Sequence, residues 1–202
     1  MTPSLLGAVS VPISRRASGA GAPPRSPPYR GRVAEADGNG WVRCRCGLRH
    51  WGLHGAAGLL LVRGGDRGPE VLLQLRSGWT HDGGTWGLPG GARDSHESTA
   101  FAALREAAEE CAIDPSAVDV VAQEPGVDHE DWSYTYVVAV AHGALTARVA
   151  NSESDEIRWV RPDDVPALAL HPGLAQAWPR LHPLVVDAGA AVSPRTAPAR
   201  EW

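Results

Sequence analysis

The sequence predicts an α/β fold built as a single domain, and three observations support this prediction. The 202 residues suffice for one good-sized domain with tails. Short β-like runs alternate with helical patterns along the chain. These runs lie on both sides of one acidic helix, which is predicted over residues 95–111. Such an order is typical of a mixed α/β domain and excludes an array of repeats.

Five segments supply the strands of the predicted sheet. Residues 56–63 (AAGLLLVR) and 70–75 (EVLLQL) are short apolar runs separated by the turn cluster GGDRGP. Residues 117–122, 133–141 and 157–160 also have strand character. The run at 133–141 is rich in aromatic and β-branched side chains, which favour strands.

Three segments are predicted to be helical. Residues 95–111 give the clearest pattern, because Asp and Ser at 94–95 can cap a helix that Ala, Leu, Glu and Arg fill. Residues 162–168 predict a helical turn. Residues 172–184 predict a further helix, which Pro179 must kink because proline has no amide hydrogen to donate.

The ends of the chain differ in composition from its middle. Residues 1–38 are expected to form a disordered leader, because they are rich in Pro, Gly, Ser and Arg and contain few apolar groups. Residues 39–54 form a segment that contains Cys and His. Residues 55–186 form the folded domain, and residues 187–202 are expected to be a flexible tail.

Charge and cysteine content narrow the possible functions. The formal net charge of −4 argues against non-specific binding to nucleic acid, which needs a basic surface. No apolar run reaches the roughly 18 residues that a membrane span requires, so no membrane partner is expected. Three cysteines, an odd number, fit a reducing compartment, and we therefore expect a cytoplasmic protein.

The predicted acidic helix places three carboxylates on one face. Glu106, Glu109 and Glu110 are three and four residues apart, so their side chains are neighbours and repel one another. A divalent cation such as Mg²⁺ would offset this repulsion, and Arg105 could orient a carboxylate. A solvated acidic surface is the alternative for the glutamates alone. The opposite, apolar side is expected to pack on the sheet through Phe101, Ala102, Leu104, Ala108 and Ile113.

The spacing around the glutamates forms a longer pattern. Gly91 is followed after five residues by Glu97, and after seven more by Arg105-Glu106 and then Glu109-Glu110. This pattern resembles the Nudix box. Two positions depart from the box. Ala107 replaces a bulky aliphatic residue, which should loosen packing slightly. Ala112 replaces the last glycine at the predicted helix end, where glycine would adopt a left-handed conformation more easily.

The resemblance to the Nudix family covers residues 55–184 and implies a fold and a reaction. It implies an α/β/α sandwich with a mixed β-sheet. It also implies Mg²⁺- or Mn²⁺-dependent hydrolysis of a nucleoside diphosphate linked to another group. Glu106 and Glu110 would bind the metal, Glu109 would bind it or activate water, and the carbonyl of Gly90 would be a further ligand. Glu97 is assigned to orienting Arg105 or to capping.

In some members of the family a distant loop carboxylate supplies a base. Glu153, Asp155 and Glu156 are the candidates here, and a polar turn is the alternative reading of these residues.

The resemblance is greatest to the MutT-type branch, which acts on nucleoside triphosphates and oxidised nucleotides. Four residues match positions of that branch that bind the nucleotide: Arg76, His81, Gly87 and Gly90. A surface charge at a strand end and a turn residue are the alternatives for Arg76 and His81. Trp79 and Trp86 could stack on a base or belong to the core.

Other functions of the Nudix family match this sequence less well. Pro125 is a poor match to the position typical of ADP-ribose hydrolases, and a nucleotide-sugar pyrophosphatase is a related alternative. A non-catalytic nucleotide-sensing module is a third possibility. The complete glutamate set argues against it.

A second group of potential ligands precedes the domain. Cys44, Cys46, His50 and His54 offer four zinc ligands within eleven residues. Their Cys-x-Cys spacing departs from the Cys-x₂₋₄-Cys of structural zinc sites, and no second knuckle follows. The sequence therefore favours a loop or first strand that packs on the domain over a zinc site.

Overall fold

Strand β3 (Ala56–Gly65) lies at the centre of the sheet in the computed structural model, which describes residues 36–143 and 145–192. Strand β8 (Trp132–Ala141) pairs with it in parallel along one edge. On the other edge β3 pairs antiparallel with β6 (Gly90–Ala92) through its first residues and with β4 (Gly68–Arg76) through its last. The described sheet has seven strands and is mixed, as predicted.

Three further strands extend the sheet outward. Strands β5 (Trp86–Gly87) and β9 (Ser154–Val160) both pair antiparallel with β4. Strand β7 (Val118–His129) pairs antiparallel with β8 and continues to residue 129, beyond its predicted end at 122. It is longer than predicted because the exposed half of a hairpin needs no apolar pattern once its partner strand supplies the hydrogen bonds.

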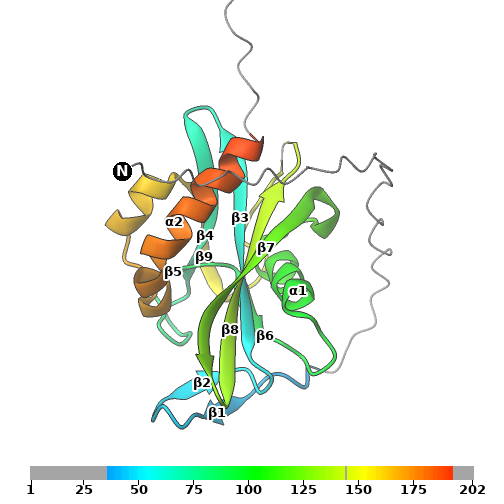
Figure 1. Ribbon diagram of the computed structural model, residues 1–202, viewed down its shortest axis with the longest axis vertical. Helices are drawn as coiled ribbons and strands as arrows, with labels where there is room; N and C mark the ends of the chain where they lie inside the picture. Colours follow the sequence, from blue (N-terminus) through cyan, green and yellow to red (C-terminus); the bar gives the residue numbers. More distant parts are fainter. Residues whose placement is uncertain (1–35, 144, 193–202) are drawn as a thin grey trace, which may run out of the picture. The chain divides into compact units, whose positions relative to one another are not determined.

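Two helices cover opposite faces of the sheet (Figure 1). Helix α1 (Thr99–Cys111) packs on one face and helix α2 (Pro172–Val192) on the other. Two 3₁₀ helices, η1 (Pro115–Ala117) and η2 (Pro162–Ala167), lie in the connections. The predicted α/β/α sandwich is therefore confirmed.

Alternating side chains of β3 build two separate cores. Leu60 and Val62 belong to the core under α2, together with buried residues of that helix such as Leu181. Leu59 and Leu61 belong to the core under α1. Since successive side chains of a strand point to opposite faces, one apolar strand holds both layers together.

Helix α1 differs from its prediction in two respects. It begins at Thr99 with Ser98 as the N-cap, because the Ser98 hydroxyl accepts from the backbone N–H of Phe101 at 3.2 Å. Phe101 is 42% exposed, so the prediction that it packs on the sheet is wrong. The most buried face instead consists of small residues, which allow the helix to lie close to the sheet: Ala102, Ala103, Ala107 and Cys111.

Helix α2 continues through Pro179 and Pro183 to Val192. Residues 187–192 are thus helical, although the sequence assigns them to the flexible tail at 187–202. Gly189 lets this part of the helix lie close to Pro69 of β4, because a β-carbon at this position would clash with the proline ring. The remainder of the tail, residues 193–202, lies outside the described residues, as do residues 1–35 of the predicted leader.

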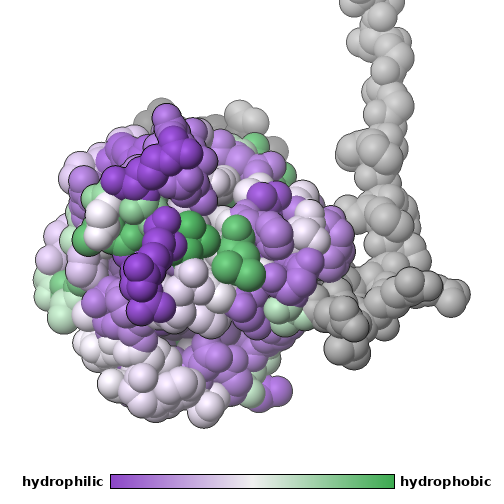
Figure 2. All heavy atoms as spheres, turned by 90° about the horizontal axis from the view of Figure 1, so that it is seen from below, coloured by the Kyte–Doolittle hydropathy of each residue, from purple (hydrophilic) through white to green (hydrophobic). Residues whose placement is uncertain are grey.

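Segment 39–54 forms a small antiparallel hairpin of β1 (Trp41–Arg43) and β2 (Arg49–Trp51). It lies at the end of the molecule near the turn between β7 and β8 (Figure 1). Figure 2 looks onto this end, where a few hydrophobic residues lie among mostly hydrophilic ones. None of the helices in the described part of the chain combines the length and apolar character of a membrane span.

Candidate active site

The predicted site forms where helix α1 faces strand β6. The Glu106 carboxylate lies against Gly91, and a β-carbon on that glycine would be 2.7 Å from the carboxylate. The backbone N–H of Gly90 donates to Glu110 at 2.9 Å. The two glycines therefore give the carboxylates access to the strand backbone, which explains the glycine at the start of the sequence pattern.

Glu110 is 2% exposed and is held by a buried polar chain. The side-chain amide of Gln74 donates to the Glu110 carboxylate at 3.1 Å and to the carbonyl of Leu88 at 3.3 Å. The hydroxyl of Ser154 in turn donates to the Gln74 carbonyl at 2.7 Å. Gln74 was not among the predicted site residues, although a polar residue inside the apolar part of the run EVLLQL is the signal that could have identified it.

Arg105 and Glu97 form a two-point contact beside the site. Nε and Nη2 of Arg105 donate to the two carboxylate oxygens of Glu97 at 2.8 and 3.1 Å. Nη2 also donates to the carbonyl of Ala92, and Nη1 to Glu106 at 2.7 Å. Glu97 precedes the first turn of the helix and also accepts from the backbone N–H of Asp94. The arginine is thereby fixed between strand, loop and helix.

Burial gives the glutamates of the site different affinities for protons. It raises the pKa of Glu106 to about 7, against the influence of Arg105, and that of Glu110 to about 8. The Glu106 charge adds to the rise at Glu110. Burial also opposes ionisation of Glu97, but hydrogen bonds from Arg105 and Asp94 outweigh it and lower its pKa. Glu106 and Glu110 thus form a repulsive pair that a cation would relieve.

The donor set at the site fits a hard divalent cation. Glu106, Glu109 and Glu110 offer only oxygen ligands, which Mg²⁺ and Mn²⁺ prefer over nitrogen and sulfur. Glu109 differs from the other two, because its side chain is 55% exposed and contacts Arg105 at 3.4 Å. A cage made of one or two buried carboxylates leaves space for phosphate oxygens and water.

The three distal carboxylates have separate environments. The Glu153 charge raises the pKa of both Glu106 and Glu110, so Glu153 lies near the site. Asp155 accepts from the Ser77 hydroxyl, and Glu156 pairs with Arg158 at 2.6 Å.

Of the predicted nucleotide-binding residues, Arg76 ends β4 and Gly87 ends β5, whereas His81 lies in the loop between these strands and Gly90 begins β6. The Arg76 charge favours ionisation of Glu110, and its Nε donates to the backbone carbonyl of His81 at 3.2 Å. Gly87 lies beside the Arg76 side chain. The exposed ring of His81 contacts Asp82 at 3.1 Å and the edge of Trp41.

The two tryptophans of this loop have different positions. Trp86 is buried in the core under α2, and the Arg158 guanidinium lies 4.6 Å from its ring centroid. Trp79 is 68% exposed, and its side-chain Nε1 donates to the carbonyl of Ser152 at 3.2 Å. Of the two, only Trp79 therefore presents a ring to a ligand in solution.

Comparisons with known proteins agree with this geometry. The family model of the NUDIX domain matches residues 52–181. A Mycobacterium tuberculosis protein named "Putative 8-oxo-dGTP diphosphatase 3" is 48% identical over 164 residues, covering 78% of this chain and 75% of that protein. A Bifidobacterium longum "Nucleoside triphosphate pyrophosphatase/Nudix hydrolase fusion protein" is 43% identical over 151 residues, covering 71% of this chain and 30% of the fusion protein.

A solved structure is similar over most of the described fold. The crystal structure of the Nudix hydrolase RenU from M. smegmatis matches with a TM-score of 0.69 and 42% sequence identity, covering 79% of this chain and 99% of that chain. Family match, relatives and fold agree with the sequence pattern that combines Gly91 of β6 with the glutamates of α1. The chain therefore belongs to the Nudix family and is a hydrolase that acts on nucleotides.

Proposed function

We propose that the chain is a metal-dependent pyrophosphohydrolase of nucleoside triphosphates, with oxidised dGTP among its substrates. The observation that carries the proposal is the pair formed by the partly buried Glu106 and the buried Glu110, whose raised pKa values and all-oxygen donors suit a divalent cation beside a phosphate chain. The name of the M. tuberculosis relative supports the choice of an oxidised nucleotide. The odd number of cysteines supports a cytoplasmic location.

Glu106, Glu109 and Glu110 would hold Mg²⁺ or Mn²⁺, with the carbonyl of Gly90 as a further ligand. When bound, the ion would neutralise phosphate charge and lower the pKa of water, so that water could attack phosphorus. Arg105 positions Glu106 through its 2.7 Å hydrogen bond, and Glu97 in turn positions Arg105. Because these hydrogen bonds already hold the side chains in place, the charged groups need to move little during the reaction.

Two carboxylates could accept the proton of the attacking water. Glu109 is the most exposed of the three helix glutamates, so it can move toward substrate. Glu153 comes from a different part of the chain, and its charge acts on both Glu106 and Glu110. Separate Glu109→Gln and Glu153→Gln variants distinguish them. Loss of the base lowers kcat across the pH range, whereas the activity of a variant that lacks a metal ligand is partly recovered at high metal concentration.

The nucleotide would bind along the ends of β4 and β5. Arg76 supplies a positive charge near Glu110, which suits the phosphate chain. Gly87 would let the substrate approach the backbone, Gly90 would line the same pocket, and His81 would contact the sugar or phosphate. The exposed ring of Trp79 would stack on the base.

The test is hydrolysis of a nucleotide panel with Mg²⁺ and with Mn²⁺: dNTPs, oxidised dGTP, ADP-ribose, nucleotide sugars and NADH. We expect metal-dependent turnover of triphosphates, reduced more than about a hundredfold by Glu110→Gln. The matched control is Glu124→Gln, which removes a glutamate that pairs with Arg180 away from the site. Preference for ADP-ribose or a nucleotide sugar would overturn the substrate assignment. Binding without any turnover would overturn the enzymatic mechanism.

A further inference from the structure

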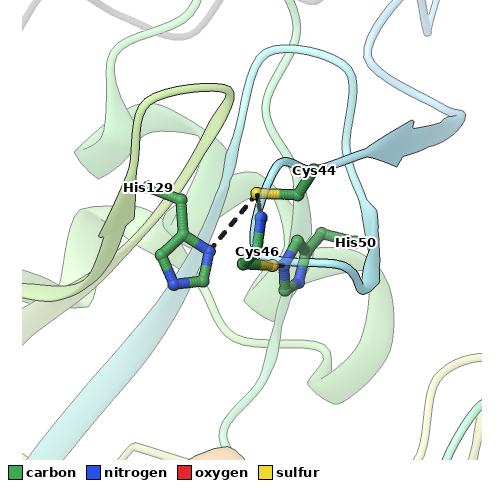
Figure 3. Close-up of side chains that lie close together, drawn as sticks. All are labelled: Cys44, Cys46, His50 and His129. Atoms are coloured by element: carbon green, nitrogen blue, oxygen red, sulfur yellow. Dashed lines mark hydrogen bonds between the residues drawn. The ribbon is translucent and has the colours of Figure 1, made fainter.

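A second cluster of ligands lies at the end of the molecule that carries β1 and β2. It contains one ligand atom from each of four side chains, all within 4.8 Å of one another: Cys44, Cys46, His50 and His129. Figure 3 shows these side chains pointing toward one another from two separate segments of the chain. Cys44 Sγ lies 3.5 Å from Nδ1 of His129, and Cys46 Sγ lies 3.1 Å from Nε2 of His50.

The fourth ligand differs from the one that the sequence offers. His54 follows His50 by four residues, but it does not belong to the cluster. Its backbone carbonyl instead accepts two hydrogen bonds from Arg93, at 2.9 and 2.6 Å. His129 replaces it, because the long hairpin of β7 and β8 brings the last residue of β7 to the β1–β2 turn.

The turn accommodates the unusual Cys-x-Cys spacing. The backbone N–H of Cys44 donates to the carbonyl of Leu48, and that of Gly47 donates to the carbonyl of Cys44, both at 3.0 Å. Gly47 has a φ of +88°, which glycine adopts without steric strain. The backbone N–H of Cys46 points to Cys44 Sγ at 3.5 Å. The two sulfur atoms can therefore face one metal ion although a single residue separates them.

We propose that these four side chains bind one structural Zn²⁺ ion. Zn–S bonds of about 2.3 Å and Zn–N bonds of about 2.0–2.1 Å place tetrahedral ligand atoms roughly 3.3–3.8 Å apart. The two sulfur–nitrogen distances of 3.5 and 3.1 Å are close to this range. Two thiolates and two imidazoles form a Cys₂His₂ set, which favours Zn²⁺ over the hard cations that the glutamate site suits.

The ion would join two hairpins that are otherwise connected by surface contacts. Arg45 pairs with Glu130 and Asp131 in the β7–β8 turn, and the His50 ring stacks on Trp132 with centroids 4.3 Å apart. A two-stranded sheet of three residues each has little stability of its own, and a metal crosslink would fix it. All four ligands come from protein, as in zinc sites that stabilise structure and do not catalyse.

The experiment measures metal content and coordination in the full chain. The protein is produced with added zinc, purified without a metal-affinity step, and its zinc is quantified by mass spectrometry. The stripped protein is then titrated with Co²⁺. We expect one Zn²⁺ per chain, and with Co²⁺ the absorption bands of a tetrahedral site with thiolate ligands.

Two ligand variants and two controls make the test specific. Cys46→Ser and His129→Asn are expected to weaken metal binding by more than about tenfold. Cys46 is exposed, so its substitution disturbs packing least, and circular dichroism verifies the fold. His54→Asn and Cys111→Ser remove a nearby histidine and a buried cysteine outside the cluster, and both are expected to keep one Zn²⁺. Substoichiometric zinc in the wild-type chain without thiolate bands for Co²⁺, or equal loss in His54→Asn and His129→Asn, would overturn the proposal.

Discussion

Arg105 and Glu97 are joined by two hydrogen bonds, from Nε to one carboxylate oxygen at 2.8 Å and from Nη2 to the other at 3.1 Å. The Glu97 side chain is almost completely buried and that of Arg105 is mostly buried, so water screens this ion pair weakly. The pair connects the loop before α1 to the middle of that helix. The pair therefore fixes the position of the Arg105 side chain relative to Glu106.

Replacing Glu97 by Gln is expected to destabilise the fold by about 2–4 kcal/mol, because it leaves a largely buried guanidinium without its main counter-charge. Chemical denaturation measures this change. The same variant is expected to lower kcat, since Arg105 can then no longer hold Glu106 in place. Glu124→Gln is the control, because it breaks a solvent-exposed pair and is expected to change stability by less than about 1 kcal/mol. Equal stability of the two variants would contradict this assignment of Glu97.

Gly91→Ala is expected to reduce activity far more than stability. The added β-carbon would stand 2.7 Å from the Glu106 carboxylate, so this side chain must move. A displacement of about 1 Å at a catalytic group can reduce the rate by about a hundredfold. Steady-state kinetics gives the rate, and a thermal melt gives the stability. Gly78→Ala is the control, because its β-carbon would meet no atom within 4 Å. Full activity of Gly91→Ala would contradict the close approach.

The metal-free protein is expected to lose stability as pH rises from about 5 to about 8. Glu106 and Glu110 have an ordinary pKa of 4.5, which folding raises to about 7 and about 8. In this window the folded state holds more protons than the unfolded chain, so the free energy of unfolding falls with pH. Urea denaturation at several pH values, in the presence of a chelator, measures the slope.

A Glu110→Gln variant isolates the contribution of one carboxylate to that slope. It should reduce the fall in the free energy of unfolding between pH 5 and pH 8 by at least about 1 kcal/mol, because the amide does not titrate. Adding Mg²⁺ or Mn²⁺ to the wild-type protein should stabilise it more at pH 8 than at pH 5, since the cation binds the ionised form. An identical pH slope for wild type and variant would contradict the raised pKa of Glu110.

The sequence predicted those parts of the site that depend on local spacing. Arg105 and Glu106 are adjacent on the predicted helix, and Glu97 was assigned to orienting Arg105 or to capping through the resemblance to the Nudix box, so the contact of Glu97 with Arg105 matches one of these two assignments. Gln74 was missed, because its role depends on contacts of β4 with Glu110 of α1 and with Ser154 of β9, which no local pattern encodes. His129 was missed for the same reason, since a long hairpin brings it to Cys44.

In the fold, too, the elements encoded by local sequence patterns were predicted and those that depend on distant partners were not. Apolar strands such as β3 were predicted within two residues of their observed ends, because burial on both faces gives a continuous apolar run. The end of β7 and the hairpin of β1 and β2 were not predicted. Their side chains are mostly exposed, so hydrogen bonding to partners determines them and hydrophobic patterning does not.

The end of α1 provides a prediction that concerns stability alone. Ala112 has φ 54° and ψ 33°, the left-handed conformation, and its N–H donates to the carbonyl of Ala108 at 3.1 Å. A β-carbon makes this conformation unfavourable, so Ala112→Gly is expected to stabilise the protein by about 0.5–1 kcal/mol. Ala108→Gly is the matched control. It lies inside the helix, where the same change is expected to destabilise by about 1 kcal/mol. Thermal or chemical denaturation compares the stability of the two variants. If Ala112→Gly destabilised the protein, residue 112 would not be strained by a left-handed conformation, and the prediction would be wrong.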